Sequence, residues 1–205
     1  MPIPSVVVFD LGKVLLDFDY RIAAQRIAAR GVVATHAVQK FLDQSPLLHR
    51  FETGLMTKEQ FFDEVRNSTG FAGGFNEFNN FFADIFLPIE PMVELHAAVR
   101  QRGMPTYIFS NTNDLAIGHI RRNFPFYANF DGYIYSYEHG AMKPNAALYE
   151  VLERQANCHN AEIFYLDDRA ENVAAGAARG WQVLLHETPG KTRAAFRKLG
   201  LLNCC

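Results

Sequence analysis

Polar or charged residues follow several short apolar stretches of this 205-residue chain. An isolated residue of this kind has an ordinary explanation, because a serine or aspartate often caps a helix and a loop lysine is usually solvated. Their recurrence after successive apolar stretches favours a shared site instead. The residues are Asp10, Ser110, Lys143 and the pair Asp167-Asp168.

The chemistry of this set indicates a site for a phosphate ester. Asp10 can act as a carboxylate nucleophile that forms a covalent intermediate. It would be repelled by Asp167 and Asp168 unless a cation sat among the three, and oxygen donors without histidine or cysteine favour a hard cation, Mg²⁺. Such a metal offsets the charge of an incoming phosphate. Lys143 adds a positive charge and Ser110 a hydroxyl donor, and the backbone amides after Asp10 can hold the oxygens of the transition state.

The elements that must position these residues are short, β-branched apolar stretches, which are typical of buried strands in a parallel sheet. Asp10 follows one of them, and open α/β sheets bind ligands at the carboxyl ends of their strands. The alternation of strands and helices predicts an α/β fold, a Rossmann-like parallel sheet flanked by helices on both faces. The expected strands span residues 6–9, 106–109, 133–135, 163–166 and 182–185, and the expected helices span 92–102, 115–122, 145–155, 171–179 and 192–198.

Residues 17–88 show helical periodicity and no expected strand. Thr57 and Gln60 form a capping-box pattern at the start of one helix. Because this block separates the first strand from the others, we expect an inserted helical cap over the carboxyl edge of the sheet. The cap domain would span 17–88, and the catalytic core 1–16 and 89–205. An aromatic stripe, typical of helix-packing core, contains Phe75, Phe78, Phe81, Phe82 and Phe86.

The bulk composition argues against several classes of partner. Hydrophobic residues make up 49% of the chain and charged residues 20%, so a buried core is expected. With a net charge of -2 and no long basic run, we expect no binding to nucleic acid or to a membrane. No stretch resembles a signal peptide or a membrane span, and cysteines without a spacing pattern suit a reducing cytoplasm. We expect a cytoplasmic monomer or homodimer in which the terminal pair Cys204-Cys205 is structurally idle.

Four motifs in order resemble those of the haloacid dehalogenase (HAD) superfamily over essentially the whole chain. They are Phe9-Asp10-Leu11-Gly12-Lys13-Val14-Leu15, Phe109-Ser110-Asn111-Thr112, Lys143-Pro144, and Tyr165-Leu166-Asp167-Asp168 with Asn172. The position of the helical block is similar to that of the subfamily whose cap follows the first motif. Three segments resemble the bacterial α-D-glucose-1-phosphate phosphatase type in particular: Ser110-Asn111-Thr112-Asn113, Gly140-Ala141-Met142-Lys143-Pro144 and Glu52-Thr53-Gly54-Leu55-Met56-Thr57.

This resemblance implies a role for each matching position. Asp10 resembles the nucleophile that becomes an aspartyl-phosphate. Asp168 resembles the direct metal ligand, with Asp167 beside it and the backbone carbonyl of Gly12 as a further ligand. The implied activity is Mg²⁺-dependent hydrolysis of a small, sugar-type phosphorylated metabolite. The implied phosphate-binding residues are Leu11, Gly12, Ser110, Asn111 and Lys143, of which Ser110 and Lys143 are also catalytic.

Gly12 departs from the usual phosphatase pattern, which places a second aspartate two residues after the nucleophile. That aspartate protonates the leaving alcohol and then activates water, and loss of such a group typically costs about 10²–10⁴-fold in rate. A sugar 1-phosphate would lessen the need, because an anomeric hydroxyl is more acidic than an ordinary alcohol. Lys13 or a cap residue such as His49 could partly substitute.

Two other functions remain open from the sequence. A 2-haloacid dehalogenase uses the same nucleophile without metal, and its carboxylate-binding arginine could be Arg21, Arg26 or Arg50. The paired carboxylates argue against that activity. A non-catalytic binding protein would explain Gly12 but not the retention of the other motif residues. Helical phase alone does not orient Tyr20, His49, Arg50 or Glu52 towards the site.

Overall fold

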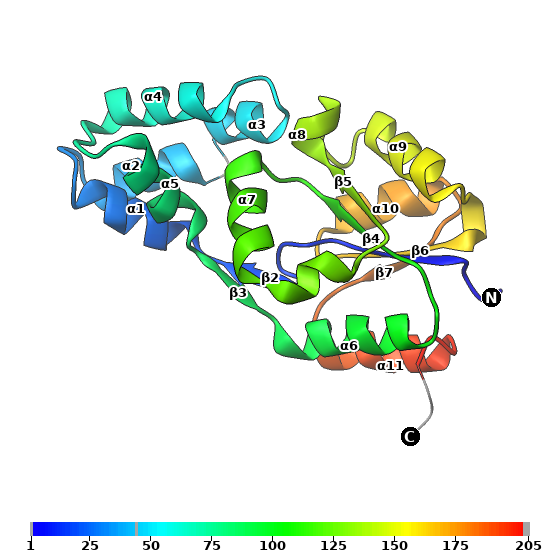
Figure 1. Ribbon diagram of the computed structural model, residues 1–205. Coiled ribbons are helices and arrows are strands. Elements are labelled where there is room, and N and C mark those ends of the chain that lie inside the picture. Colours follow the sequence, from blue (N-terminus) through cyan, green and yellow to red (C-terminus); the bar gives the residue numbers. More distant parts are fainter. Residues whose placement is uncertain (1, 44, 203–205) are drawn as a thin grey trace.

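The centre of the molecule is a parallel β-sheet, seen in a computed structural model that describes residues 2–43 and 45–202. Its five strands run in the spatial order β5-β4-β1-β6-β7, and every neighbouring pair is parallel. The predicted α/β fold is therefore confirmed, with all five expected strands present (Figure 1). The strands are β1 (Val6–Phe9), β4 (Thr106–Ser110), β5 (Gly132–Tyr135), β6 (Ile163–Asp167) and β7 (Gln182–Leu185).

Helices cover both faces of this sheet because alternate side chains of each buried strand point to opposite faces. Val7 and Phe9 of β1 belong to one apolar cluster, and Val6 and Val8 belong to another. The first cluster is completed by α6 (Glu90–Gln101), α7 (Asp114–Asn123) and α11 (Pro189–Lys198), and the second by α9 (Ala146–Ala156) and α10 (Ala170–Ala178). Burial on both faces explains why β1 is a continuous apolar run.

The strand order creates a switch point beside β1. The chain runs from β1 outward through β4 to β5, and then returns to place β6 on the other side of β1. A crevice at the carboxyl ends of two such strands is the usual ligand site of this class of sheet. Asp10 follows β1 and Asp167 ends β6, so the topology brings these two carboxylates to the same point.

Five helices form a bundle with an apolar cluster of its own, at one end of the sheet (Figure 1). Phe78 and Phe82 of the aromatic stripe lie inside this cluster, with Phe75 and Phe81 packed against it. The predicted capping box is confirmed, because Thr57 and Gln60 exchange side chain–backbone hydrogen bonds of 2.9 and 3.2 Å. The helices are α1 (Tyr20–Ala28), α2 (Thr35–Leu42), α3 (Pro46–Glu52), α4 (Lys58–Thr69) and α5 (Phe75–Ala83).

The expectation that residues 17–88 contain no strand is wrong. β2 (Leu16–Phe18) and β3 (Phe86–Pro88) pair antiparallel and connect the bundle to the sheet. Each strand has three residues, too few to show a period of two, and the pairing joins segments about seventy residues apart, which local patterns do not reveal. Phe86 accordingly lies in β3, outside the helix of the stripe, although it still packs against the bundle. The proposed domain boundaries lie within β2 (16/17) and directly after β3 (88/89), and they stay a prediction.

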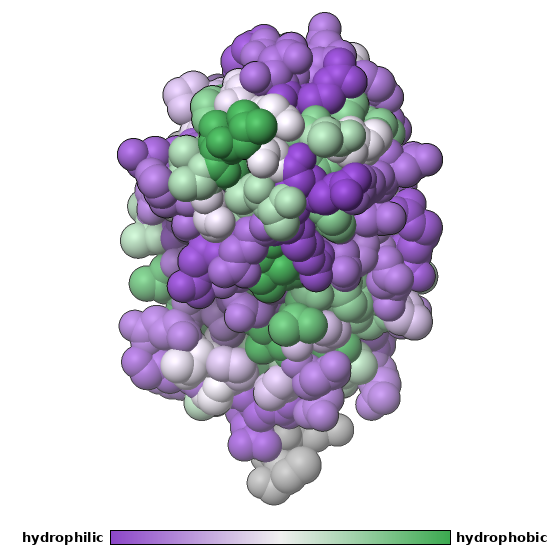
Figure 2. Space-filling model, turned by 90° about the vertical axis from the view of Figure 1, so that its left-hand side faces the viewer, coloured by the Kyte–Doolittle hydropathy of each residue, from purple (hydrophilic) through white to green (hydrophobic). Residues whose placement is uncertain are grey.

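Several smaller elements complete the chain. The short helix α8 (Ser136–His139) and the 3₁₀ helices η1 (Pro125–Asn129) and η2 (Asn160–Glu162) lie in connections. The last helix begins at Pro189 rather than at residue 192, because Thr188 caps it. Among the described residues no helix is long and apolar enough to cross a membrane. Hydrophilic side chains cover most of the face in Figure 2, and Cys204-Cys205 lies outside the described residues.

Candidate active site

Asp10 lies at the carboxyl end of the central strand and is almost completely buried. Its backbone N–H donates to the carbonyl of Leu166, which continues the ladder with β6 for one more residue. Its Oδ1 accepts a hydrogen bond of 2.7 Å from the N–H of Leu11 and lies 3.0 Å from Nζ of Lys143. The carboxylate is therefore held in one orientation by the backbone turn that follows it.

Lys143 links the two central carboxylates. Its Nζ lies 2.6 Å from Oδ2 of Asp167 and 3.0 Å from Oδ1 of Asp10, and it donates to the carbonyl of Phe109 at 2.7 Å. Asn111 fixes the backbone of this lysine: its Oδ1 accepts from the N–H at 2.7 Å, and its Nδ2 donates to the carbonyl at 3.0 Å. These bonds use Oδ1 and one N–H of Nδ2, so the second N–H of Nδ2 and the backbone N–H of Asn111 are the donors to consider for the expected contact with phosphate.

Asp167 is fully buried behind Asp10 and is held by several donors. The Tyr165 hydroxyl and the Asn172 amide donate to its carboxylate, and the N–H of Arg169 donates to its Oδ1 at 2.8 Å. The next residue, Asp168, is partly exposed and lines the cavity described below. Adjacent carboxylates thus have different environments, one enclosed and one open.

Asp10, Asp167 and Asp168 suit a hard cation. Each offers one carboxylate oxygen, and the three oxygens lie within 4.8 Å of one another. Their donors are oxygens only, the kind that Mg²⁺ prefers. One lysine faces three carboxylates, so the cluster carries excess negative charge that a divalent cation would offset. Gly12, the fourth expected ligand through its carbonyl, also lines the cavity.

The charges of this cluster shift each other's pKa values. Burial raises the pKa of Asp10 well above its usual value, the neighbouring Asp167 and Asp168 add to this rise, and Lys143 opposes it. Burial alone would raise the pKa of Asp167 too, but its bonds with Lys143 and Tyr165 hold it below the usual value. Burial would lower the pKa of Lys143, but the two carboxylates raise it instead. Lys143 is therefore a permanent cation between them.

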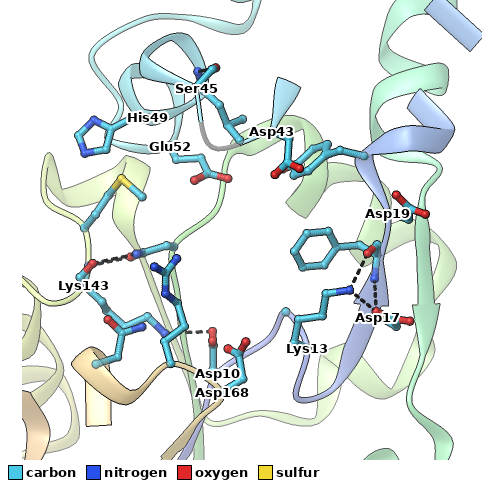
Figure 3. A pocket seen from close by; sticks show the side chains of 18 of the residues that line it. Asp10, Lys13, Asp17, Asp19, Asp43, Ser45, His49, Glu52, Lys143 and Asp168 are labelled. Atoms are coloured by element: carbon cyan, nitrogen blue, oxygen red, sulfur yellow. Dashed lines mark hydrogen bonds and ion pairs between the residues drawn. The ribbon is translucent and has the colours of Figure 1, made fainter. Parts of the chain in front are cut away.

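A cavity of about 840 Å³ separates the sheet from the bundle. We call one side the sheet wall, formed by Asp10, Lys143 and Asp168. The opposite side, the helix wall, is formed by Asp43, His49 and Glu52, and Figure 3 shows these two walls facing each other. The volume falls within the usual range for small-molecule sites, which is roughly 300–1,000 Å³.

Ser110 and Leu11 open into a second, small cavity of about 40 Å³. Gly12, Asn111 and Glu52 line both cavities, so the small one is a side pocket of the large one. The Ser110 hydroxyl is buried and donates to the carbonyl of Asn111 at 3.3 Å. The structure thus brings together all the residues that the motifs selected.

The structure shows which residues of the bundle face the cavity, a point that the sequence left open. Among the described residues, those that line the cavity include Tyr20, Arg21, His49 and Glu52, but not Arg26 or Arg50. Arg21 is paired with Asp19 at 2.7 Å. Sequence reasoning did not select Asp43 or Arg169, although the position of Arg169 directly after the paired carboxylates was a usable signal.

Phe18 explains the glycine at position 12. A Cβ atom on Gly12 would lie 2.8 Å from Cε1 of Phe18, too close for any other side chain unless the ring moved. The ring is packed between Tyr20 and Phe86, at centroid distances of 5.6 and 5.8 Å. The aromatic side chain of β2 therefore occupies the space that an acidic side chain at position 12 would need.

Known proteins resemble this chain along most of its length. A family model described as a hydrolase, haloacid dehalogenase-like hydrolase, matches residues 4–180. The sesquiterpene phosphatase astK of Aspergillus oryzae is 25% identical over 187 residues, and the match covers 88% of each protein.

Two solved structures share the fold at 22% sequence identity. One is a HAD family enzyme of Bacteroides thetaiotaomicron in complex with magnesium and inorganic phosphate, with a TM-score of 0.78 over 90% of this chain and 94% of that one. The other is a predicted HAD-like family hydrolase of Porphyromonas gingivalis, with a TM-score of 0.78 over 95% of this chain and 98% of that one. The sheet and the bundle together are thus an arrangement found in other proteins.

Proposed function

The chain belongs to the haloacid dehalogenase-like hydrolase family, and we propose that within it this hydrolase is a Mg²⁺-dependent phosphatase of small phosphomonoesters. The observation that carries the proposal is the buried Asp10–Lys143–Asp167 network, which opens through Asp10 and Asp168 into a cavity. A carboxylate fixed by a backbone N–H at the end of a strand is suited to nucleophilic attack. The phosphatase of Aspergillus and the magnesium and phosphate in the Bacteroides structure support the same reaction.

Each polar group of the sheet wall has a part in this reaction. Asp10 attacks the phosphorus and becomes an aspartyl-phosphate, which water then hydrolyses. Lys143, the Ser110 hydroxyl and the backbone amides of Leu11 and Gly12 hold the phosphoryl oxygens. The ligands of Mg²⁺ would be Asp10, Asp168, the Gly12 carbonyl and, directly or through water, Asp167. When bound, the ion offsets the negative charge of the phosphoryl group.

We propose a polar, sugar-type leaving group as the substrate class. The helix wall presents Asp43, His49 and Glu52 to the cavity, and Ser45 lies beside them (Figure 3). Carboxylates, imidazole and hydroxyl groups can bind the hydroxyls of a sugar but gain nothing from a hydrocarbon chain. The similarity to α-D-glucose-1-phosphate phosphatases stays a prediction. A sesquiterpenyl phosphate is the apolar substrate against which sugar phosphates should be compared.

We also propose that the α1–α5 bundle is a cap domain of residues 17–88 on a catalytic core of residues 1–16 and 89–205. Its apolar cluster is distinct from the two clusters of the sheet and adjoins one of them through Leu115 of α7 and through Phe86. The cavity lies between the bundle and the sheet, and the substrate must enter there. Movement of a cap is a common way to admit substrate and then exclude water.

A dehalogenase is less consistent with the geometry. The adjacent Asp167 and Asp168 suit a metal, which that reaction does not use. Arg21 reaches the cavity, but its guanidinium is paired with Asp19. A binding protein without activity would have no use for an oriented Asp10. Phosphate ester hydrolysis therefore accounts for more of the buried charges than either alternative.

The experiment is phosphate release from a panel of phosphomonoesters, with Mg²⁺ or with EDTA, by the wild type and Asp10→Asn. We expect release that requires Mg²⁺ and vanishes in the variant, with sugar phosphates preferred over a sesquiterpenyl phosphate. Full activity on a 2-haloacid in EDTA would instead establish the dehalogenase, and no turnover of either class would contradict both. Thermal unfolding of Asp10→Asn controls for misfolding.

A further inference from the structure

The proposed reaction needs a proton donor for the leaving alcohol, and position 12 cannot provide it. Gly12 has no side chain, and Phe18 occupies the space next to it. The first candidate is Lys13, but its Nζ is bonded to the Asp17 carboxylate and to the carbonyl of Phe18 at 2.8 Å (Figure 3). The group that replaces the missing aspartate must therefore come from elsewhere on the cavity.

An in-line displacement determines where that group must be. The nucleophile and the leaving oxygen lie on opposite sides of the phosphorus. With Asp10 on the sheet wall, the leaving oxygen points to the helix wall, which contains Asp43, His49 and Glu52. Asp43 and His49 are exposed, whereas Glu52 is partly buried.

Glu52 is the one helix-wall residue that also belongs to the small side pocket. It lines the small side pocket together with Gly12 and Ser110. Tyr20 lines both cavities with it, its ring packs on Phe18, and its hydroxyl lowers the pKa of Glu52. Figure 3 shows the Glu52 carboxylate directed into the cavity, towards the side that bears Asp10 and Asp168.

We propose that Glu52 is the general acid and base of this hydrolase, with Tyr20 as its positioning residue. The proposal rests on the phosphatase function proposed above. It assigns to a bundle helix the role that an aspartate after the nucleophile has in related phosphatases. It also gives Phe18 a function, because the same ring that excludes a side chain at position 12 supports Tyr20.

The reaction then balances in two steps. In the first, an Asp10 oxygen bonds to phosphorus, and the ester P–O bond breaks with its electron pair going to the leaving oxygen. That oxygen takes the proton of the Glu52 carboxyl, so an alcohol and an aspartyl-phosphate form. In the second, Glu52 takes a proton from water as the water oxygen bonds to phosphorus. The bond to Asp10 breaks, its electron pair returns to the carboxylate, and phosphate leaves with Glu52 protonated again.

The electrostatics of Glu52 suit both steps. Burial raises its pKa to about 7, while the charge of Arg169 and the Tyr20 hydroxyl favour the charged form. The groups that face this region are Tyr20 of α1, Asp43 after α2, His49 of α3 and Arg169 before α10. A carboxyl group with a pKa near neutral pH can both donate and accept a proton there.

The contacts at the end of α3 fix the backbone around Glu52. Glu52 is the last residue of the helix, and the Thr53 hydroxyl after it donates to the carbonyl of His49 at 2.6 Å. Gly54 then turns with a φ of 73°, so close to α8 that a Cβ would lie 2.1 Å from the Tyr137 carbonyl oxygen. The backbone that positions Glu52 is thus in contact with α8, the short helix that follows strand β5 of the sheet.

The test is the dependence of Glu52→Gln on the leaving group, with Glu64→Gln on the exposed face of α4 as the matched control. An alkyl phosphate such as a sugar 6-phosphate needs a proton on its leaving oxygen, whereas para-nitrophenyl phosphate barely does. We expect Glu52→Gln to lower kcat on the alkyl ester by about 10²–10⁴-fold and on the aryl ester by less than about 10-fold. Glu64→Gln is expected to match the wild type on both.

Other outcomes overturn the proposal. An equal loss on both esters would make Glu52 a binding or structural residue, and no loss would exclude it from proton transfer. Tyr20→Phe gives a second test that does not remove the carboxylate: the Tyr20 hydroxyl lowers the pKa of Glu52, so without it this pKa rises and the alkaline limb of kcat moves to higher pH. An unmoved limb would contradict the assignment. Failure of the wild type on every ester would instead refute the phosphatase function itself.

Discussion

The two walls of the cavity are built differently. On the sheet wall, Asp10 and Lys143 are buried and fixed by hydrogen bonds to neighbouring strands and loops. On the helix wall, Asp43 and His49 are exposed, and Glu52 is partly buried in the cavity lining that it shares with Tyr20. A fixed set of charges is suited to stabilising the same transition state in every turnover. Side chains on a separate bundle can differ between related enzymes without disturbing those charges.

The sheet wall also carries a larger concentration of buried charge than the helix wall. Three carboxylates lie within 4.8 Å of one another and share one buried lysine. Such a cluster stabilises a fold poorly, because each buried charge loses its hydration. Its presence at the switch point of the sheet is therefore evidence for function. The following predictions test this difference between the walls.

The largest effect is expected from Lys143→Met. Removal of the buried cation leaves Asp10 and Asp167 uncompensated, which should lower the free energy of unfolding by about 3–5 kcal/mol. Lys13→Met is the control, since Lys13 and Asp17 form an exposed pair, and we expect at most about 1 kcal/mol there. Urea unfolding in EDTA measures both. Equal losses of unfolding free energy in the two variants would show that the buried ion pairs of Lys143 contribute no more to stability than an exposed pair.

Gly54→Ala tests the contact between the turn after α3 and α8. Alanine at this position would strain the backbone and collide with the carbonyl of Tyr137, at a cost of about 3 kcal/mol. Gly103 has a similar φ of 76° but open space around it, so Gly103→Ala should cost about 1 kcal/mol. Only Gly54→Ala should also lower kcat on alkyl phosphates. Loss of activity in both variants would argue against a specific role for this contact.

The pH dependence of stability tests a buried histidine that belongs to neither wall. His96 is buried against Phe130, and burial lowers its pKa from 6.5 to about 4. Between these two values the unfolded chain binds a proton at His96 that the folded chain does not bind. The contribution of His96 to stability is therefore fully present above pH 6.5 and is lost as the pH falls towards 4. At pH 5 the loss should be about 2 kcal/mol. Urea titrations at several pH values should show a shallower slope for His96→Gln, and no change for the exposed His36→Gln.

A smaller effect is expected at a helix start that lines neither cavity. Thr57 caps α4, and Thr57→Ala should lower stability by about 1 kcal/mol. The exposed Ser68→Ala on the same helix is the control. Thermal unfolding measures the stability of each variant, and neither substitution should change kcat. A loss of activity in Thr57→Ala would extend the functional part of the bundle beyond the helix wall.

The sheet could be predicted from the sequence because its signals are local. A buried parallel strand such as β1 is a continuous apolar run, and Asp10 follows it directly. The same rule located Lys143 and Asp167, since the carboxyl ends of parallel strands share one edge. These residues could be grouped without knowledge of any long-range contact.

The helix wall could not be predicted in this way. The direction in which Glu52 points depends on how α3 packs, and α3 has seven residues with no distinct period. The ribbon of β2 and β3 depends on a pairing between distant segments. The role of Phe18 beside Gly12 appears only when that ribbon is in place. Side-chain orientation on inserted helices is a product of tertiary packing, and propensity carries little information about it.

The most direct test of the central claim is to trap the phosphoryl group on the enzyme. A phosphomonoester with a labelled phosphoryl group is mixed with the wild type and Mg²⁺, quenched in acid during turnover, and the label is mapped by peptide mass spectrometry. We predict label on the peptide that contains Asp10, and none in Asp10→Asn or in EDTA. Rapid phosphate release without label on Asp10, or full activity in Asp10→Asn, would contradict the account.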